Sequence, residues 1–303
     1  DLLDALEVTH SFIPMSLPLG CYVQHLDSSR RPDQPPNAGA VKLIADQMSK
    51  YELISLSMGG HTAQEQIELM TNGFWPQMTS RSAALLSSKG DYLSAIICIP
   101  YRSLDFIQGQ RITRAIRDND MSSLNGISEK LIEYFLADKY PEILCFLAEC
   151  DTAAAEVALR QDESKDVIAA KKLAEYVAHD NNCEPGSHWV EELGLIASDD
   201  DAPLGSMTGL IPVILKEMWL GGIKMAIGHY NNYSATVAIR TGGVQIVKVE
   251  YCQAKSLGPR PCEDVNAKRF KFMQTEIPNR GLPAEFMIVH DLEELSRKLQ
   301  WTK

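Results

Sequence analysis

The sequence predicts an α+β protein that is predominantly α-helical, with a helical body and a smaller C-terminal part that contains a β-hairpin. Three observations predict this class. Apolar residues recur at helical spacing from about residue 103 to residue 195. Two alternating segments, 233–240 and 244–251, flank a pair of glycines, as the strands of a hairpin do. An Asp-Asp-Asp run at 199–201, followed by Pro and Gly, separates the two patterns.

The N-terminal third is expected to begin with an extended arm. Residues 11–37 are rich in proline and serine, and proline lacks a backbone N–H donor and disfavours regular structure. The apolar spacing after this arm predicts a helix over 38–50. Thr62 and Glu65 have the spacing of a capping box, in which each side chain binds the other residue's backbone N–H, and they predict a helix over 63–72.

The rest of the chain divides into helices and then strands. A β-branched run at 91–99 predicts a strand, and helices follow to residue 195. Near the end of the chain, 284–290 predicts a strand, and Asp291 stands where it can cap a final helix. The predicted regions are therefore an extended N-terminal arm over 1–37, a mainly helical domain over 38–200 and a β-containing basic C-terminal part over 201–303.

The hairpin is predicted with a specific register. A three-residue loop at 241–243 pairs Val237 with Val247 and Ala235 with Val249, which gathers the apolar side chains on one face. A two-residue loop would pair Val237 with Lys248 instead. Side-chain alternation therefore favours the longer loop.

Composition places the chain among intracellular globular proteins. Apolar residues make up 45% and charged residues 23%, and the net charge is −11. No apolar run reaches the roughly 18 residues that cross a bilayer. The seven cysteines are scattered and form no CxxC pair, which is typical of a reducing compartment. We therefore predict a cytoplasmic or otherwise intracellular protein without a membrane span.

The charge is divided unevenly along the chain. Residues 1–219 hold 32 acidic and 17 basic side chains, whereas residues 220–281 hold 4 acidic and 9 basic ones. A basic segment on an acidic protein meets either a polyanion or the acidic surface of another subunit. The leading hypothesis is a non-enzymatic, self-assembling or nucleic-acid-binding structural protein of the nucleocapsid-like kind, with single-stranded RNA or a neighbouring copy as its partner.

This hypothesis assigns the nucleic-acid contacts to two groups of basic residues. One is a helical stripe with i, i+3, i+6 spacing, and the other is the basic C-terminal segment with its interleaved aromatic residues. The candidates are Arg111, Arg114, Arg117, Lys248, Lys255, Arg260, Lys268, Arg269 and Lys271. The alternative is that both groups are ordinary solvated faces of a helix and of a strand.

A serine hydrolase is the alternative function. An apolar segment at 52–56 runs into Ser57 and Gly59 and then into a predicted helix. This stretch resembles the nucleophile elbow of the α/β-hydrolases, which implies Ser57 as the nucleophile. Ser55 stands where that family has a glycine, and Asp201 and His290 follow in the chain order that the triad requires.

A metal-binding or small-molecule-binding loop is the third possibility. His179, Cys183 and His188 lie close together, and thiolate with imidazole suits zinc. Their spacing matches no common zinc module, and an incidental polar loop is the simpler interpretation. No phosphate-binding loop or dinucleotide fingerprint is present in the sequence. We therefore predict no metal and no cofactor.

Overall fold

The computed structural model describes residues 16–53, 62–101, 115, 121–124, 141–183, 186–254 and 271–302. They form one seven-stranded mixed sheet in the order β1-β2-β3-β4-β5-β7-β6. The strands are β1 (Tyr22–His25), β2 (Ala83–Leu86), β3 (Tyr92–Pro100), β4 (Val190–Ser198), β5 (Met225–Asn231), β6 (Val244–Glu250) and β7 (Ala284–Asp291).

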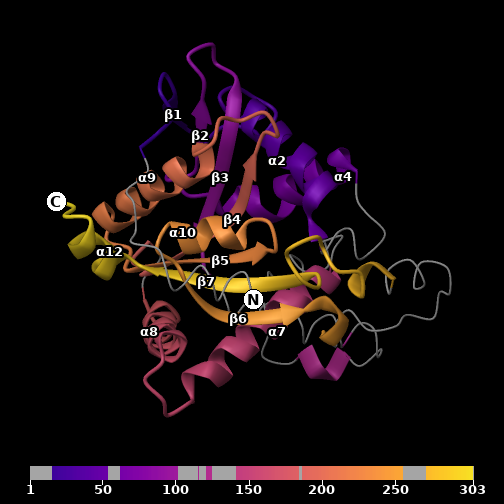
Figure 1. Cartoon of the computed structure of the whole chain (residues 1–303), viewed down its shortest axis with the longest axis vertical. Coiled ribbons are helices and arrows are strands. Elements are labelled where there is room, and N and C mark those ends of the chain that lie inside the picture. The colour runs from indigo at the N-terminus through magenta and orange to yellow at the C-terminus, as the bar shows by residue number, and fades with distance from the viewer. Residues whose placement is uncertain are drawn as a thin grey trace.

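Helices cover both faces of this sheet (Figure 1). Among the described residues, no helix is long and apolar enough to cross a membrane. The α-helices are α2 (Asn37–Tyr51), α4 (Ala63–Leu69), α7 (Pro141–Ala158), α8 (Lys165–Asp180), α9 (Ser206–Leu220), α10 (Ala235–Arg240) and α12 (Leu292–Lys298). Short π and 3-10 turns are η1 (Met70–Phe74), η2 (Trp75–Gln77), η3 (Met121–Leu124) and η4 (Tyr251–Gln253).

Side-chain alternation along the strands assigns each helix to a face. On β3, Ile97 and Ile99 pack with α2, whereas Ile96 and Cys98 pack with α9. Further along the sheet, α7 and α8 share the face of α2, and α10 and α12 share the face of α9. The first face is called the α7 face below, and the second is called the α9 face.

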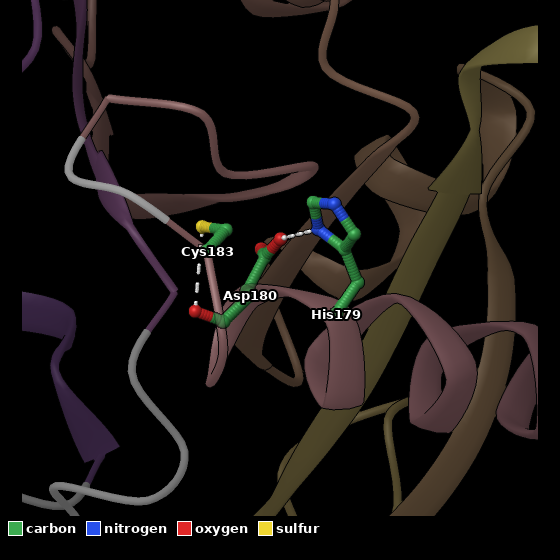
Figure 2. Close-up of side chains that lie close together, drawn as sticks. All are labelled: His179, Asp180 and Cys183. Carbon is green, nitrogen blue, oxygen red and sulfur yellow. Dashed lines mark hydrogen bonds and ion pairs between the residues drawn. The ribbon is translucent and has the colours of Figure 1, made fainter.

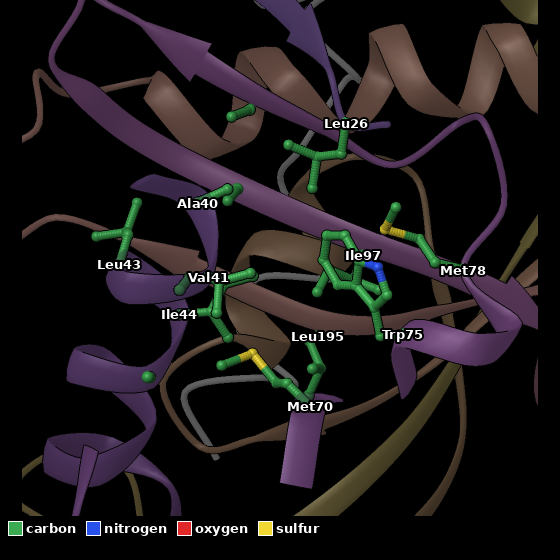
Figure 3. Close-up of a cluster of buried hydrophobic side chains, with 14 of the residues drawn as sticks. Leu26, Ala40, Val41, Leu43, Ile44, Met70, Trp75, Met78, Ile97 and Leu195 are labelled. Carbon is green, nitrogen blue, oxygen red and sulfur yellow. The ribbon is translucent and has the colours of Figure 1, made fainter. Parts of the chain in front are cut away.

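The core beside α2 is tightly filled (Figure 3). Ile44 of α2 and Ile97 of β3 are fully buried there, next to Met70 and Trp75. Truncating a side chain such as Ile97 to alanine typically costs about 2–5 kcal/mol in such a site. This packing fixes α2 against the sheet, and the C-terminal end of α2 lines the candidate site.

The predicted fold class is wrong, because the molecule is organised around this sheet and not around a helical body. The largest miss is β4, which lies inside the segment predicted to be helical and pairs with β3 and β5. The sheet also takes strands from both sides of the acidic run at 199–201. The division of the chain into three regions stays a prediction.

The predicted hairpin is wrong as well. The segment 233–240 contains helix α10, and β6 pairs antiparallel with β7, which is more distant in the sequence. The side chain of Asn231 accepts hydrogen bonds from the backbone N–H groups of Tyr233 and Ser234, at 2.9 and 3.1 Å. This turn stops β5 and starts the helix, so local capping and a non-local strand partner override the β-branched composition.

Other local predictions are confirmed. Thr62 and Glu65 form the capping box of α4. The strand predicted at 91–99 is β3, and the one predicted at 284–290 is β7. Asp291 caps α12 by accepting a hydrogen bond from the backbone N–H of Glu294 at 3.0 Å.

Candidate active site

Two adjacent parallel strands separate within the sheet. β4 and β5 pair only over their first residues, from Val190 with Met225 to Glu192 with Ile227. Beyond that point, no described strand pairs with the facing edge of either one. In Figure 1, β4 continues upward with β1–β3, whereas β5 runs across the view with β7 and β6. We call this divergence the fork.

A β-bulge explains why the strands diverge. On β4, Leu193 pairs with Cys98 and Leu195 pairs with Ile97, so Gly194 between them has no partner on β3. An extra residue of this kind bends its strand and increases the local twist. A side chain at Gly194 would press on Ile99, since an added Cβ would lie 3.3 Å from it. The bulge therefore carries the second half of β4 away from β5.

A cavity of about 270 Å³ lies in the opening of the fork, between β4 and β5. The second halves of β4 and β5 form its walls, and the end of α2 and the starts of α9 and α10 surround them. Its lining residues are Gln47, Met48, Tyr51, Glu52, Ile196, Ala197, Ser198, Asp200, Met207, Ile211, Tyr230, Asn231, Tyr233, Ser234 and Val237.

A buried charged cluster lies at the base of the fork, on the α7 face. His229 of β5 has its Nδ1 atom 3.1 Å from an oxygen of Glu192 and its Nε2 atom 3.5 Å from Asp151 of α7. The hydroxyl of Tyr101 donates a hydrogen bond to the same oxygen of Asp151 at 2.5 Å. Burial opposes a charge on His229, but the two carboxylates outweigh it and raise the pKa of the imidazole to about 10. The ring is therefore an imidazolium at neutral pH.

Glu285 of β7 adds a further carboxyl group on the same face. Burial and the nearby charge of Glu52 raise the pKa of Glu285 to about 8, and the hydroxyl of Tyr251 donates a hydrogen bond to it at 2.8 Å. Glu52 itself lines the cavity. The cluster thus holds several acidic groups, Asp151, Glu192 and Glu285, around the single imidazolium of His229.

Several buried polar atoms at the fork lack hydrogen-bond partners among the described residues. They are Asp151 Oδ2, Glu192 Oε2, His229 Nε2 and the hydroxyl of Tyr230. Buried polar atoms are normally satisfied, so water or a polar ligand can bind to these atoms. Of the four residues, Tyr230 also lines the cavity.

Tyr230 approaches the fork from the α9 face. Its ring folds back over Gly228, where an added Cβ would lie 2.6 Å from the ring and 2.7 Å from the hydroxyl oxygen. Burial, followed by the charge of Glu192, raises the pKa of Tyr230. The phenol therefore stays protonated and can act as a hydrogen-bond donor at the fork.

The structure places few of the residues that the sequence singled out. Arg111, Arg114, Arg117, Lys255, Arg260, Lys268, Arg269 and the serine Ser57 lie outside the described residues. Lys248, on β6, lies 3.3 Å from Glu250, and Lys271 is exposed in a helical turn. His290 is buried on β7, where its Nε2 atom lies 3.1 Å from the Thr241 hydroxyl, and Asp201 is exposed.

Sequence reasoning missed the fork cluster. Tyr101, Asp151, Glu192, His229 and Glu285 were not singled out, because each stands alone in the sequence. One sequence signal could have found two of them. His229 and Glu285 are polar, ionisable side chains inside the otherwise apolar segments Met225–Asn231 and Ala284–Asp291.

Comparisons with known proteins give structural likeness alone. No family model and no curated protein matches the chain. A polyamine N-acetyltransferase of Drosophila melanogaster has 12% sequence identity and a TM-score of 0.48, with 89% of this chain and 99% of that chain covered. A mosquito arylalkylamine N-acetyltransferase-like protein has 12% identity and a TM-score of 0.49, with the same coverage. An agmatine N-acetyltransferase also has 12% identity and a TM-score of 0.49, with 89% and 98% covered.

The prediction of a nucleocapsid-like, RNA-binding structural protein is wrong, because the architecture on which it rested is not the one observed. The described residues are organised around a seven-stranded sheet and not around a helical body. The segment predicted as the first strand of the basic hairpin contains helix α10. Association with further copies of the chain, the other predicted partnership, stays a prediction.

Proposed function

We propose that the protein is an enzyme that transfers an acyl group from a thioester to a small organic amine, with the fork as its active site. The excess of buried carboxyl groups at the fork carries this proposal. Asp151 and Glu192 flank one compensating cation, His229, so this group carries a net negative charge. The raised pKa of Glu285, about 8, keeps that further carboxyl group largely protonated at neutral pH. Buried charge without a partner is costly, and an alkylammonium group supplies the missing positive charge.

The mouth of the cavity suits an organic cation. Tyr51 and Tyr233 lie edge to face there, with ring centroids 5.7 Å apart, and both are partly exposed. Aromatic faces attract cations, and the Glu52 carboxyl lines the same cavity. The Arg280 guanidinium already lies over the Tyr233 ring, 5.0 Å from its centroid, which shows that this ring accepts a cation. The Tyr51 ring and the Glu52 carboxyl favour an amine over an anionic or purely apolar acceptor.

The other wall of the fork suits an extended donor such as an acyl-coenzyme A. Beyond Glu192, no described strand pairs with the edge of β4 that faces β5, and a ligand that contains amide groups can pair with this edge as a strand would. Helix α9 begins beside the cavity with no side-chain cap and no acidic residue in its first turn. The Ser206 N–H donates a hydrogen bond to the Pro203 carbonyl at 3.1 Å, and the N–H groups that follow it in the first turn can receive a phosphate. Asp200, in the loop before α9, is paired with Lys50 at 3.1 Å.

The residues at the fork can manage the protons of this reaction. The bound ammonium gives one proton to Glu192 Oε2, which later releases it to solvent. The free amine then attacks the thioester carbonyl carbon, a C–N bond forms and the C–S bond breaks. Tyr230 donates its proton to the departing sulfur and takes the second proton from the nitrogen. An amide and a thiol leave. His229 keeps its charge while Glu192 holds the proton, because the Asp151 carboxylate stays ionised beside it.

The test is direct. Purified protein is incubated with acetyl-coenzyme A and a panel of mono- and diamines, and both released thiol and acetylated amine are measured. We expect amide formation that depends on protein and on amine. If no acyl-coenzyme A and no amine gives an amide product, the proposal is overturned.

An intracellular location is part of the same proposal. The five cysteines whose side chains the structure describes are all free, as in a reducing compartment. The acyl thioesters that the proposed reaction consumes are also intracellular compounds. Fractionation of cells that express the tagged protein tests this location, and recovery in the secreted fraction would contradict it.

A further inference from the structure

We propose a second site: a binding site for a zinc-class divalent cation at the end of α8, formed by His179, Asp180 and Cys183. One ligand atom from each residue lies within 4.8 Å of the others (Figure 2). Imidazole nitrogen, carboxylate oxygen and thiolate sulfur together suit zinc and its neighbours, and a three-residue protein set leaves a position for water. This site is independent of the proposed acyl transfer.

The distance between the first two ligands fits a metal ion. His179 Nδ1 lies 3.0 Å from Asp180 Oδ1. Zinc bonds of about 2.0–2.1 Å to nitrogen and oxygen set tetrahedral ligands roughly 3.3 Å apart. A cation can therefore replace the proton that these two atoms share, with only a small adjustment. Figure 2 shows the Cys183 side chain beside the same carboxylate.

Two of the ligands are already held in place. The Asp180 carboxylate accepts hydrogen bonds from the backbone N–H groups of Trp189 and Val190, at 2.8 and 2.9 Å. The His179 ring stacks on the Trp189 ring, with centroids 3.4 Å apart and an interplanar angle of 7°. Binding would thus cost little side-chain entropy, and such support is typical of metal ligands.

The local charge also favours a cation. His179 and Asp180 end α8, where the helix dipole is negative. The Lys224 ammonium lies on the far side of this support, 3.2 Å from the centroid of the Trp189 ring. The imidazole occupies one face of that ring, so the ammonium lies over the opposite face. The indole therefore separates the lysine from the proposed site.

Cobalt(II) is the probe for this site, because its thiolate complexes have a charge-transfer absorption band. We expect this band at one cobalt per chain in the wild-type protein, and we expect zinc to abolish it by competition. Cys252→Ser is the matched control, since Cys252 is an exposed thiol outside the cluster. The control should bind as the wild type does.

The variants decide the assignment. Cys183→Ser should lose the charge-transfer band, and His179→Gln should weaken cobalt binding by roughly tenfold or more, because even outer partners of a metal are worth 10–100-fold. Circular dichroism verifies that both variants fold, and Cys183→Ser removes no hydrogen bond that the strands need. Absence of the band from folded wild-type protein, or its persistence in Cys183→Ser, would overturn the proposal.

Discussion

Two buried histidines on paired strands have opposite charge states. His229 of β5 faces α7 and is surrounded by carboxylates, which raise its pKa to about 10. His290 of β7 faces α10 and lies among neutral groups, Thr241 and the carbonyl of Ala238. Burial, only partly opposed by that carbonyl, lowers the pKa of His290 to about 4.

This difference locates the chemistry of the molecule. Burial alone makes a histidine neutral, as at His290, and such a residue is part of the packing. A buried imidazolium requires carboxylates that are themselves buried, and such perturbed groups cluster at functional sites. The proposed function therefore places its proton acceptor on the α7 side of the fork and gives the surroundings of His290 a structural role.

Glu192→Gln should have the largest effect. It removes the proposed proton acceptor, and general-base groups typically contribute about 10²–10⁴-fold to rate. We expect kcat/KM for amine acylation to fall by that order. Glu250→Gln on β6 is the control and should leave the activity near wild type, since Glu250 pairs with Lys248 away from the fork. Equal activity in both variants would remove Glu192 from the mechanism.

Replacing the two histidines separately should sharpen the comparison. His229→Leu leaves the carboxylates without their cation, and breaking a buried pair in this way costs about 3–5 kcal/mol. His290→Leu loses neutral hydrogen bonds, worth about 1 kcal/mol each. Urea denaturation measures both free energies of unfolding. Similar losses in the two variants would mean that His229 is not charged.

Gly228→Ala should disturb the fork without changing any charge. The new Cβ would press on the Tyr230 ring, and overpacking of this kind costs about 1–3 kcal/mol. We expect the Tyr230 hydroxyl to move and the acylation rate to fall. Gly90→Ala is the control, since no atom lies near an added Cβ there, and it should leave the acylation rate near wild type. Full activity in Gly228→Ala would argue against a role for Tyr230.

The pH dependence of stability should show both histidines. His229 and Glu285 have raised folded pKa values of about 10 and about 8, so their stabilisation is complete at low pH and is lost as pH rises through those values. His290 has a lowered pKa, so its contribution holds above about 6.5 and is lost as pH falls towards 4. Each group changes the free energy of unfolding by at most about 1.4 kcal/mol per pH unit. Glu285→Gln should flatten the curve between about pH 4.5 and 8, and an unchanged curve would contradict the assignment.

Local signals in the sequence predicted local structure well. The capping box of Thr62 and the cap at Asp291 are decided by neighbouring residues, and both are confirmed. β4 was missed because Glu191 and Glu192 interrupt its apolar pattern and the bulge at Gly194 breaks its alternation. The charges of Glu191 and Glu192 are compensated by Arg81 and His229, which are distant in the sequence.

The candidate site could not be predicted for the same reason. Tyr101, Asp151, Glu192, His229 and Glu285 come from separate elements, and only the sheet order brings them together. A single histidine in an apolar strand describes His229 and His290 equally well. What separates them is the set of partners across the sheet, which a single sequence does not give.

The charge of His229 tests the central claim most directly. Nitrogen-15 NMR of the imidazole rings distinguishes imidazolium from neutral imidazole, and His229→Gln and His290→Gln assign the two signals. At pH 7.5 we expect His229 to give the imidazolium pattern and His290 the neutral one, in the same spectrum. If His229 is neutral at that pH, the fork holds no buried cation, and the account of the active site is wrong.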